Sequence, residues 1–340
     1  MPVTIRDLAQ QLNLSIATVS RALDNYSDIS PKTRQRVQQA AQQMGYTPNR
    51  AARQLRRKKA DAIGYILPSG TPRFADPFYA EFLVGLSDEC ALHPFDLLVS
   101  NAPPGAQAEQ DVYASWVQSR KVDGFVLNRL RHDDWRSRFL YTQGTPFVSL
   151  EHDYQEFEYR SVEVDNAGGM LTLVQHLASA GYRRLAYIGG PADLLIQRQR
   201  YAGFCQGLEQ AGLALDPERV LPGDLTSEAG FQAVKHMRWI PDPPDAIVCV
   251  NDETAFGALH ALHDLGLKIG QQVGVTGFDG VQAAMHTDPP LTTLDIPVYE
   301  IARQLVRLLA AEINHQPTAE RLAIQPRLLA RASTHRIAPA

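Results

Sequence analysis

The chain has 340 residues and a formal net charge of −4, but its charges are divided unevenly along the sequence. Residues 1–60 hold 11 Lys and Arg against 3 Asp and Glu, a charge of +8, while the remaining residues hold 22 against 34, a charge of −12. No apolar run approaches the length of a membrane span, and no secretory signal pattern opens the chain. The composition excludes a membrane-spanning protein and favours a basic nucleic-acid-binding head on an acidic body.

The first 45 residues predict three short helices. Thr4 and Ser15 are suited to cap the first and second helices, Ser30 is suited to cap the third, and Gly45 is a typical helix end. Apolar side chains recur at helical spacing within each segment. The first two helices, joined by a tight turn, predict a helix-turn-helix, and the alternative is a three-helix cap with solvated charges.

The second predicted helix has the side chains of a DNA-reading helix. The small and hydroxyl residues Ala17, Thr18 and Ser20 would allow close approach to the major groove, and Arg21 could reach a guanine edge or a phosphate. The candidate DNA contacts in the head are Thr4, Ser15, Ile16, Ala17, Thr18, Ser20, Arg21, Ser30, Thr33 and Tyr46.

From residue 62 onward, short β-rich runs alternate with amphipathic stretches, which predicts parallel sheets with helices on both faces. We expect strands at 63–67, 95–100, 124–128, 146–150, 161–164, 185–189, 246–251 and 274–278. We expect helices at 79–92, 108–119, 167–179, 198–211, 227–237, 253–265 and 298–312. About 280 residues are more than one such sheet usually needs, so we expect two lobes.

Ligands of open α/β sheets bind at the carboxyl ends of the strands, and polar or aromatic residues follow several predicted strands. Carboxylate, amide and guanidinium groups suit vicinal hydroxyls, and an aromatic ring suits the apolar face of a sugar. The candidate ligand contacts are Asp76, Phe78, Asn128, Glu151, His152, Arg200, Asn251 and Asp279. A purely structural role stays open for Asp279, as a turn residue, and for His152, as a rim residue.

The sequence contains no motif of an enzyme. No Gly-rich phosphate loop precedes a helix, and no Ser or Cys lies in a nucleophile motif. His260-x-x-His263 lacks a further ligand, so we expect neither a metal site nor catalytic residues, and no cofactor. Three widely separated cysteines, Cys90, Cys205 and Cys249, indicate free thiols and a cytoplasmic protein.

Several motifs along the chain are typical of one protein family. The head contains A-T-V-S-R at 17–21, G-Y-x-P-N at 45–49 and A-x-x-L at 52–55. The body contains R-x-x-G-F at 200–204, V-N-D at 250–252, G-F-D at 277–279, P-P-L-T-T at 289–293 and L-x-x-R-A-S-T at 328–334. With these motifs, the chain resembles the lactose-repressor (LacI/GalR) family of bacterial transcription regulators.

The resemblance implies a domain order. It places an all-α helix-turn-helix DNA-binding domain at 1–48, a hinge helix and linker at 49–60, and an effector-binding and dimerisation core at 61–336. The core would be two doubly wound α/β lobes like those of periplasmic binding proteins. The expected N-lobe is about 62–161 plus 292–322, and the expected C-lobe is about 162–291 plus 323–336.

The resemblance also implies roles for single residues. Asn49, Ala52 and Leu55 of the hinge would contact DNA, with Ala52 at the minor groove and Leu55 inserted as an apolar wedge. Arg200, Asn251 and Asp279 lie in matching motifs and would bind the effector, whereas the other candidate ligand contacts follow from position alone. Leu225 stands where some relatives have a stacking aromatic residue.

These features together predict a ligand-responsive regulator and, by resemblance, a repressor of carbohydrate-utilisation genes. It would bind a pseudo-palindromic operator as a homodimer, without a membrane partner, and a sugar or oligosaccharide between the lobes would change its DNA affinity. A nucleobase or nucleoside is the alternative effector. A transport-type binding protein and a sugar-processing enzyme are the competing functions.

Overall fold

The structure, a computed structural model, describes residues 3–47, 59–67, 76–102, 106–153 and 156–336. The chain separates into two compact units, residues 1–60 and residues 61–340. The expected division at residues 48 and 49 lies outside the described residues and stays a prediction.

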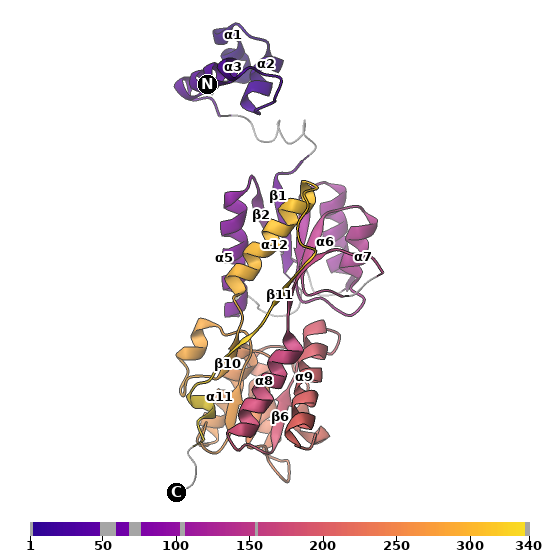
Figure 1. Ribbon diagram of the computed structural model, residues 1–340, viewed down its shortest axis with the longest axis vertical. Helices are drawn as coiled ribbons and strands as arrows, with labels where there is room; N and C mark the ends of the chain where they lie inside the picture. Colours follow the sequence, from indigo (N-terminus) through magenta and orange to yellow (C-terminus); the bar gives the residue numbers. More distant parts are fainter. Residues whose placement is uncertain (1–2, 48–58, 68–75, 103–105, 154–155, 337–340) are drawn as a thin grey trace. The chain divides into compact units, whose positions relative to one another are not determined.

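The first unit contains three helices, α1 (Ile5–Leu12), α2 (Ile16–Leu23) and α3 (Pro31–Met44) (Figure 1). Leu8, Val19 and Val37, one from each helix, are fully buried and form the centre of its core. Gly45 ends α3 in the left-handed conformation, where a side chain would be strained. The predicted helix-turn-helix is confirmed.

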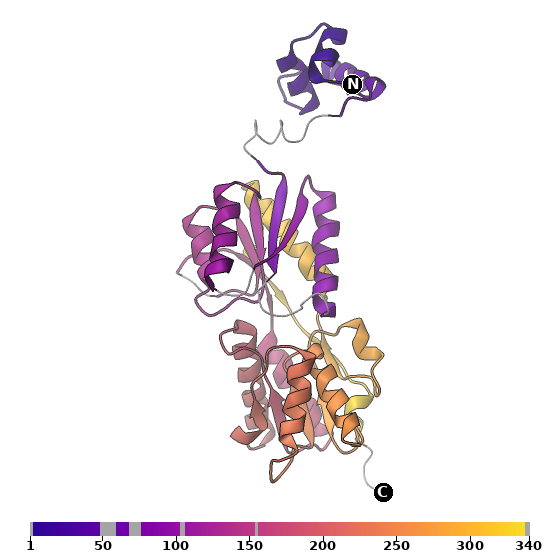
Figure 2. The ribbon, with the colours of Figure 1, turned by 180° about the vertical axis from the view of Figure 1, so that it is seen from behind.

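The first part of the second unit, which we call the N-lobe, is built on a six-stranded parallel sheet of order β11-β5-β4-β3-β1-β2. Its strands are β1 (Ala62–Leu67), β2 (Asp96–Asn101), β3 (Gly124–Leu127), β4 (Phe147–Leu150), β5 (Arg160–Val164) and β11 (Arg321–Ile324). Its helices are α5 (Pro77–Leu92), α6 (Ala106–Gln118), α7 (Trp135–Thr142) and α12 (Val298–Ile313). Seen from behind, α5 and α12 lie on one face of the sheet and α6 and α7 on the other (Figure 2).

The second part, the C-lobe, is built on a parallel sheet of order β7-β6-β8-β9. Its strands are β6 (Leu185–Ile188), β7 (Val220–Leu221), β8 (Ala246–Cys249) and β9 (Gly274–Thr276). Its helices are α8 (Asn166–Ser179), α9 (Leu195–Ala211), α10 (Ser227–Met237) and α11 (Asp252–Asp264), with short 3-10 turns at Pro217–Arg219, Gln282–Met285 and Ala332–Thr334. Gly203 of α9 lies so close to the backbone of Ala167 that any side chain there would collide with α8.

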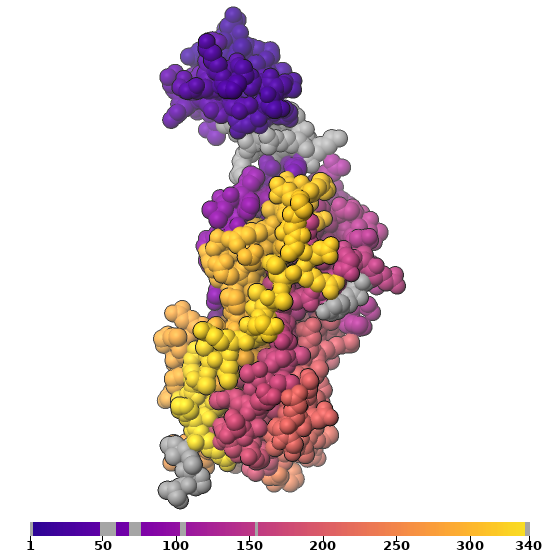
Figure 3. Space-filling model, in the orientation of Figure 1, coloured from indigo at the N-terminus to yellow at the C-terminus, as the bar shows by residue number. Residues whose placement is uncertain are grey.

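Three chain segments connect the lobes: β5 to α8, β10 (Thr293–Asp295) to α12, and β11 to β12 (Arg327–Leu329). β10 and β12 pair with each other. Thr292 forms a bridge to Thr276 at the end of β9 and Asp295 forms one to Asp279 just beyond it, so this segment lies with the C-lobe. In the space-filling view the C-terminal segment, in yellow, runs along both lobes (Figure 3).

The lobe boundaries differ from the expected ones by a few residues. β5 and β11 stay paired to Val164 and Ile324 in the N-lobe sheet, so residues 162–164 and 323–324 do not belong to the C-lobe. Residues 292–295 in turn lie beside the C-lobe sheet. The reason is that the chain can cross to the other lobe only after the last hydrogen bond that pairs the strand with its neighbour.

All eight predicted strands and all seven predicted helices of the body are present within a few residues, which confirms the fold class. Five further elements were not predicted from the sequence: β7, β10, β11, β12 and α7. Among the described helices, none combines the length and the apolar character that a bilayer crossing requires.

Candidate functional site

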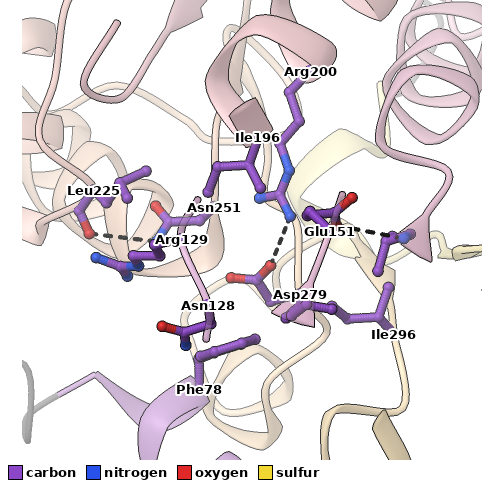
Figure 4. Close-up of a pocket in the computed structure, with 12 residues that line it drawn as sticks. Phe78, Asn128, Arg129, Glu151, Ile196, Arg200, Leu225, Asn251, Asp279 and Ile296 are labelled. Carbon is purple, nitrogen blue, oxygen red and sulfur yellow. Dashed lines mark hydrogen bonds and ion pairs between the residues drawn. The ribbon is translucent and has the colours of Figure 1, made fainter. Parts of the chain in front are cut away.

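A cavity between the lobes contains most of the candidate ligand contacts (Figure 4). Its lining is Phe78, Asn128, Arg129, Leu150, Glu151, Val164, Ile196, Arg200, Leu225, Asn251, Asp279 and Ile296. Its volume is about 40 Å³, room for about three water molecules. A ligand as large as a sugar therefore requires the lobes to move apart.

On the C-lobe side, Arg200 donates hydrogen bonds in three directions, and the one to Asp279 is drawn in Figure 4. Its Nε donates to Asn166 Oδ1 at 2.8 Å, its Nη1 to the Val250 carbonyl at 2.6 Å, and its Nη2 to Asp279 Oδ1 at 3.3 Å. The guanidinium carbon lies 3.6 Å from the centre of the Phe278 ring. Because every nitrogen is engaged, the side chain has one orientation, and it orients Asp279 in turn.

Asp279 is a buried carboxylate at the carboxyl end of β9. Burial raises its pKa to about 6, and the Arg200 ion pair opposes that rise. At neutral pH the group is therefore mostly ionised, in a place with little solvent. A buried carboxylate beside a fixed guanidinium is suited to accept hydrogen bonds from ligand hydroxyls.

On the N-lobe side, Glu151 follows β4 directly. Its Oε1 accepts a hydrogen bond from Asn166 Nδ2 at 3.0 Å and another from the Val164 N–H at 3.4 Å. Burial raises the pKa of Glu151 to about 7, although these hydrogen bonds and the nearby Arg200 oppose the rise. Since Asn166 also binds Arg200, one chain of polar contacts joins the two lobes beside the cavity.

Four lining residues other than glycine have the left-handed backbone conformation: Arg129 at φ +48°, Glu151 at +72°, Leu225 at +71° and Asp279 at +116°. Each follows a strand within four residues. Such conformations cost roughly 1–3 kcal/mol each and cluster at functional sites. Here the strained backbone turns the side chains toward the space between the lobes.

The two lining asparagines differ in what they can offer a ligand. Asn251 caps α11, since its Oδ1 accepts from the Thr254 N–H at 3.0 Å, and its Nδ2 donates to the Leu225 carbonyl at 3.4 Å. Asn128 is buried, and its amide oxygen has no hydrogen-bond partner in the part of the chain that the structure describes. Asn128 therefore has an acceptor that a ligand could satisfy.

Two candidate contacts, Asp76 and His152, are absent from the lining of this cavity, and their predicted contact with the effector stays a prediction. Asp76 caps α5 through its Oδ1, which accepts from the Phe78 N–H at 3.0 Å, and its Oδ2 accepts from Arg129 Nη2 at 3.3 Å. His152 is buried within the N-lobe, where its ring stacks on Tyr159 with centroids 4.1 Å apart. Both carry out structural tasks that position after a strand does not reveal.

Several lining residues were not predicted from the sequence. They are Arg129, Leu150, Val164, Ile196 and Ile296, and Leu225 was expected only as a departure from relatives. Arg129 had a usable signal, because it directly follows Asn128 at the end of β3. Leu150 and Val164 are apolar residues at strand ends, and nothing in the sequence distinguishes them from the other apolar residues of buried strands.

A second set of contacts ties the lobes together near the cavity. The Arg131 side chain donates to Asp193 at 3.2 Å, the His132 N–H donates to the Asp193 carbonyl at 3.1 Å, and the Leu195 N–H donates to the Leu130 carbonyl at 2.9 Å. Residues 130–132 follow β3 in the N-lobe, and residues 193–195 precede or begin α9 in the C-lobe. Opening the cavity widely would break these contacts.

In the head, the candidate hydroxyls act as helix caps. Ser15 Oγ accepts from the Thr18 N–H at 3.0 Å, Ser30 Oγ accepts from the Thr33 N–H at 3.2 Å, and Thr4 forms a capping box with Asp7. These caps hold the helix starts where their free N–H groups could receive phosphates.

The other candidate DNA contacts in the head differ in how exposed their side chains are. Ile16, Ala17 and Arg21 are exposed on α2, and Thr18, Thr33 and Tyr46 are partly exposed. Ser20 is buried on the inner side of α2, so its side chain does not face outward as predicted. Arg21 binds Asp28 at 2.5 Å. Asn49, Ala52 and Leu55 lie outside the described residues.

Comparison with known proteins identifies both parts of the chain. Residues 4–49 match the lacI family of bacterial regulatory proteins, and residues 174–334 match the periplasmic binding protein-like domain. The HTH-type transcriptional repressor CytR of Escherichia coli (strain K12) is 32% identical over 315 residues, which cover 92% of this chain and 90% of CytR.

Solved structures of two regulators are similar over nearly the whole chain. The lac repressor dimer bound to operator and the anti-inducer ONPF has a TM-score of 0.83 and 26% identity, and the match covers 98% of this chain and 99% of that one. The transcriptional regulator CelR in complex with cellobiose has a TM-score of 0.75 and 28% identity, with 97% and 99% covered.

Proposed function

Because this chain belongs to the lacI family of bacterial regulatory proteins, we propose that it is a repressor whose DNA affinity is controlled by a small carbohydrate. The repressor binds a pseudo-palindromic operator as a homodimer and acts in the cytoplasm, where operator DNA lies. It is a regulator without catalytic activity.

The observation that carries the proposal is the cavity lined from both lobes. A ligand held there contacts Arg200 and Asp279 of the C-lobe together with Asn128 of the N-lobe. It therefore favours one angle between the lobes over another. CelR, a similar regulator, has been solved with a sugar, cellobiose, which supports a carbohydrate as the effector.

A nucleoside is the second candidate effector, because half of the lining is apolar. Phe78, Ile196 and Ile296 offer flat or branched apolar surface that would also pack against a base. Sugar hydroxyls and a nucleoside ribose would both use Asp279, so the polar groups do not separate the two ligands. A direct binding comparison does.

A dimer is supported by the small size of one DNA-binding head and by exposed apolar side chains on the N-lobe. One small head buries too little area for tight specific binding, whereas two heads can read two half-sites about one helical turn apart. Val84 and Leu92 on α5 and Val99 on the edge strand β2 are exposed to 52%, 70% and 42%. In the proposed hinge, Asn49, Ala52 and Leu55 contact the operator centre.

The proposal is tested by operator selection followed by binding with and without ligand. We expect a two-fold symmetric footprint, and we expect one class among mono- and disaccharides and nucleosides to change operator affinity about 5- to 150-fold. A single asymmetric half-site bound by a monomer would contradict the dimer. No effect of any sugar or nucleoside would contradict the ligand control.

Replacing Arg21 by alanine should weaken specific operator binding by roughly 1–3 kcal/mol and relax the preference at one base pair. The residue lies on the exposed face of α2, and its guanidinium is held by Asp28 in the free head. Asp28→Asn is the matched control, since it releases Arg21 and should not weaken binding. Affinities for operators mutated one position at a time check this, and an equal loss on every sequence would make Arg21 a phosphate contact.

A further inference from the structure

Arg129 is a cavity residue with an unusual backbone and little exposure. It lies two residues after β3, its φ is +48°, and its side chain is 10% exposed. Burying a charged side chain is costly unless its charge is paired and its donors are hydrogen-bonded. In the described structure the donors of Arg129 are only partly hydrogen-bonded.

The guanidinium of Arg129 has one ion pair and one ring contact. Its Nη2 donates to Asp76 Oδ2 at 3.3 Å, and its guanidinium carbon lies 4.9 Å from the centre of the Tyr79 ring. Its Nη1 is buried and has no hydrogen-bond partner among the described residues. Arg200, the other lining arginine, uses Nε, Nη1 and Nη2 for protein acceptors.

Unused donors on a buried guanidinium are costly, and the ligand that removes most of this cost is one with an acceptor-only oxygen. A carboxylate or phosphate binds the edge formed by Nη1 and Nη2 with two charge-assisted hydrogen bonds. A neutral hydroxyl has a single oxygen and no charge. An unpaired Nη1 would therefore favour an anionic ligand over a neutral one.

The neighbouring acids do not prevent an anion from binding. Asp76 is already engaged by Arg129 and by the cap of α5, and Asp279 is paired with Arg200. Glu151, the remaining acid in the lining, has a pKa raised to about 7 by burial and can take up a proton when an anion enters.

We propose that Arg129 determines the specificity of the interlobe cavity by binding an anionic oxygen group of the effector, as in a sugar acid or a sugar phosphate. Asp76, whose carboxylate already pairs with Nη2 of Arg129, competes with the effector for the same guanidinium. This inference rests on the proposed function, because it names the ligand class of the same cavity.

The test is calorimetric titration of the full-length protein with matched pairs of probes. The pairs are D-galacturonate with D-galactose and D-glucuronate with D-glucose, and glucose 6-phosphate is the phosphate arm. In wild type we expect an anionic probe to bind about tenfold or more tightly than its neutral counterpart.

Three variants locate the preference. Arg129→Gln should bring the ratio of affinities close to one, and Asp76→Asn, which keeps a good helix cap, should raise the ratio because the opposing carboxylate is gone. Arg120→Gln, at an exposed arginine outside the lining, should leave it unchanged. A role in folding alone would not make Arg129→Gln and Asp76→Asn move the ratio in opposite directions.

The outcomes separate this inference from the proposed function. A preference for glucose 6-phosphate that depends on Arg129 supports the inference with phosphate as the anion. Equal affinity for both members of each pair together with no Arg129-dependent preference for glucose 6-phosphate over glucose, or no binding of any anionic probe to wild type, overturns it. A neutral sugar that changes operator affinity equally in wild type and Arg129→Gln contradicts only the inference. An anionic probe that needs Arg129 but leaves operator affinity unchanged contradicts only the proposed function.

Discussion

Asp279→Ala should abolish the effect of the ligand on operator binding while the ligand-free protein still folds and binds its operator. Asp279 is the buried carboxylate of the cavity and the ion-pair partner of Arg200. Losing a charged hydrogen-bond acceptor costs roughly 1.5–3 kcal/mol in ligand binding, about 10- to 150-fold in affinity. That loss is as large as an ordinary coupling free energy between two sites, about 1–3 kcal/mol.

A matched variant separates the charge of Asp279 from its backbone. Alanine at φ +116° is strained, whereas asparagine tolerates left-handed conformations and keeps an oxygen that accepts from Arg200. Asp279→Asn should therefore fold like wild type and still lose most of the ligand response. The measurement is operator affinity with and without saturating ligand in all three proteins. A ligand effect of wild-type size in both variants would remove Asp279 from the site.

The head could be predicted nearly completely because its determinants are local. The hydroxyls of Ser15 and Ser30 cap helices that begin at the next residue, and Gly45 ends α3. Capping and left-handed helix ends depend on a few neighbouring residues, so they can be read from the sequence. The orientation of Ser20 could not, since it depends on the packing of α2 against two other helices.

The missed elements of the body depend on distant residues. β11 pairs with β5, which lies about 160 residues earlier, and β10 pairs with β12, each strand of the second pair having three residues. Such short segments have no alternation long enough to be detected. The inward side of α7 carries the polar residues Arg136 and Ser137, so its sequence has no apolar stripe. Arg136 is buried with its ion-pair partner Asp134, at 2.6 Å.

The site could be predicted where a polar residue follows a strand and has no stronger local partner. Arg200, Asn251 and Asp279 do line the cavity. Asp76 follows the same rule of position but is engaged by the helix start and by Arg129. Position after a strand thus predicts the edge of the sheet, while hydrogen-bond competition decides which side chain remains available.

The pH dependence of stability should change when Glu151 is replaced by glutamine. In the unfolded chain this carboxyl has an ordinary pKa of 4.5, and in the folded protein burial raises the pKa to about 7. Between these values the folded state holds the proton more tightly, so raising the pH through this window reduces the stability. The group's contribution is complete below pH 4.5 and lost above pH 7.

Glutamine has no proton to lose and can still accept from Asn166 and the Val164 N–H. From pH 5 to pH 8, the free energy of unfolding of Glu151→Gln relative to wild type should rise by about 2–3 kcal/mol. Urea denaturation at both pH values measures this difference. The titration of Asp279 occurs in both proteins, so its contribution cancels. Glu158→Gln, at an exposed carboxylate of the same lobe, is the control.

A constant difference between Glu151→Gln and wild type at both pH values would show that Glu151 keeps an ordinary affinity for protons in the fold. A rising difference would show that the contact between Glu151 and Asn166, which joins the lobes beside Arg200, changes its charge near neutral pH. The angle between the lobes would then respond to a proton through the same contacts that a ligand uses, so ligand affinity and operator affinity should be compared at one fixed pH.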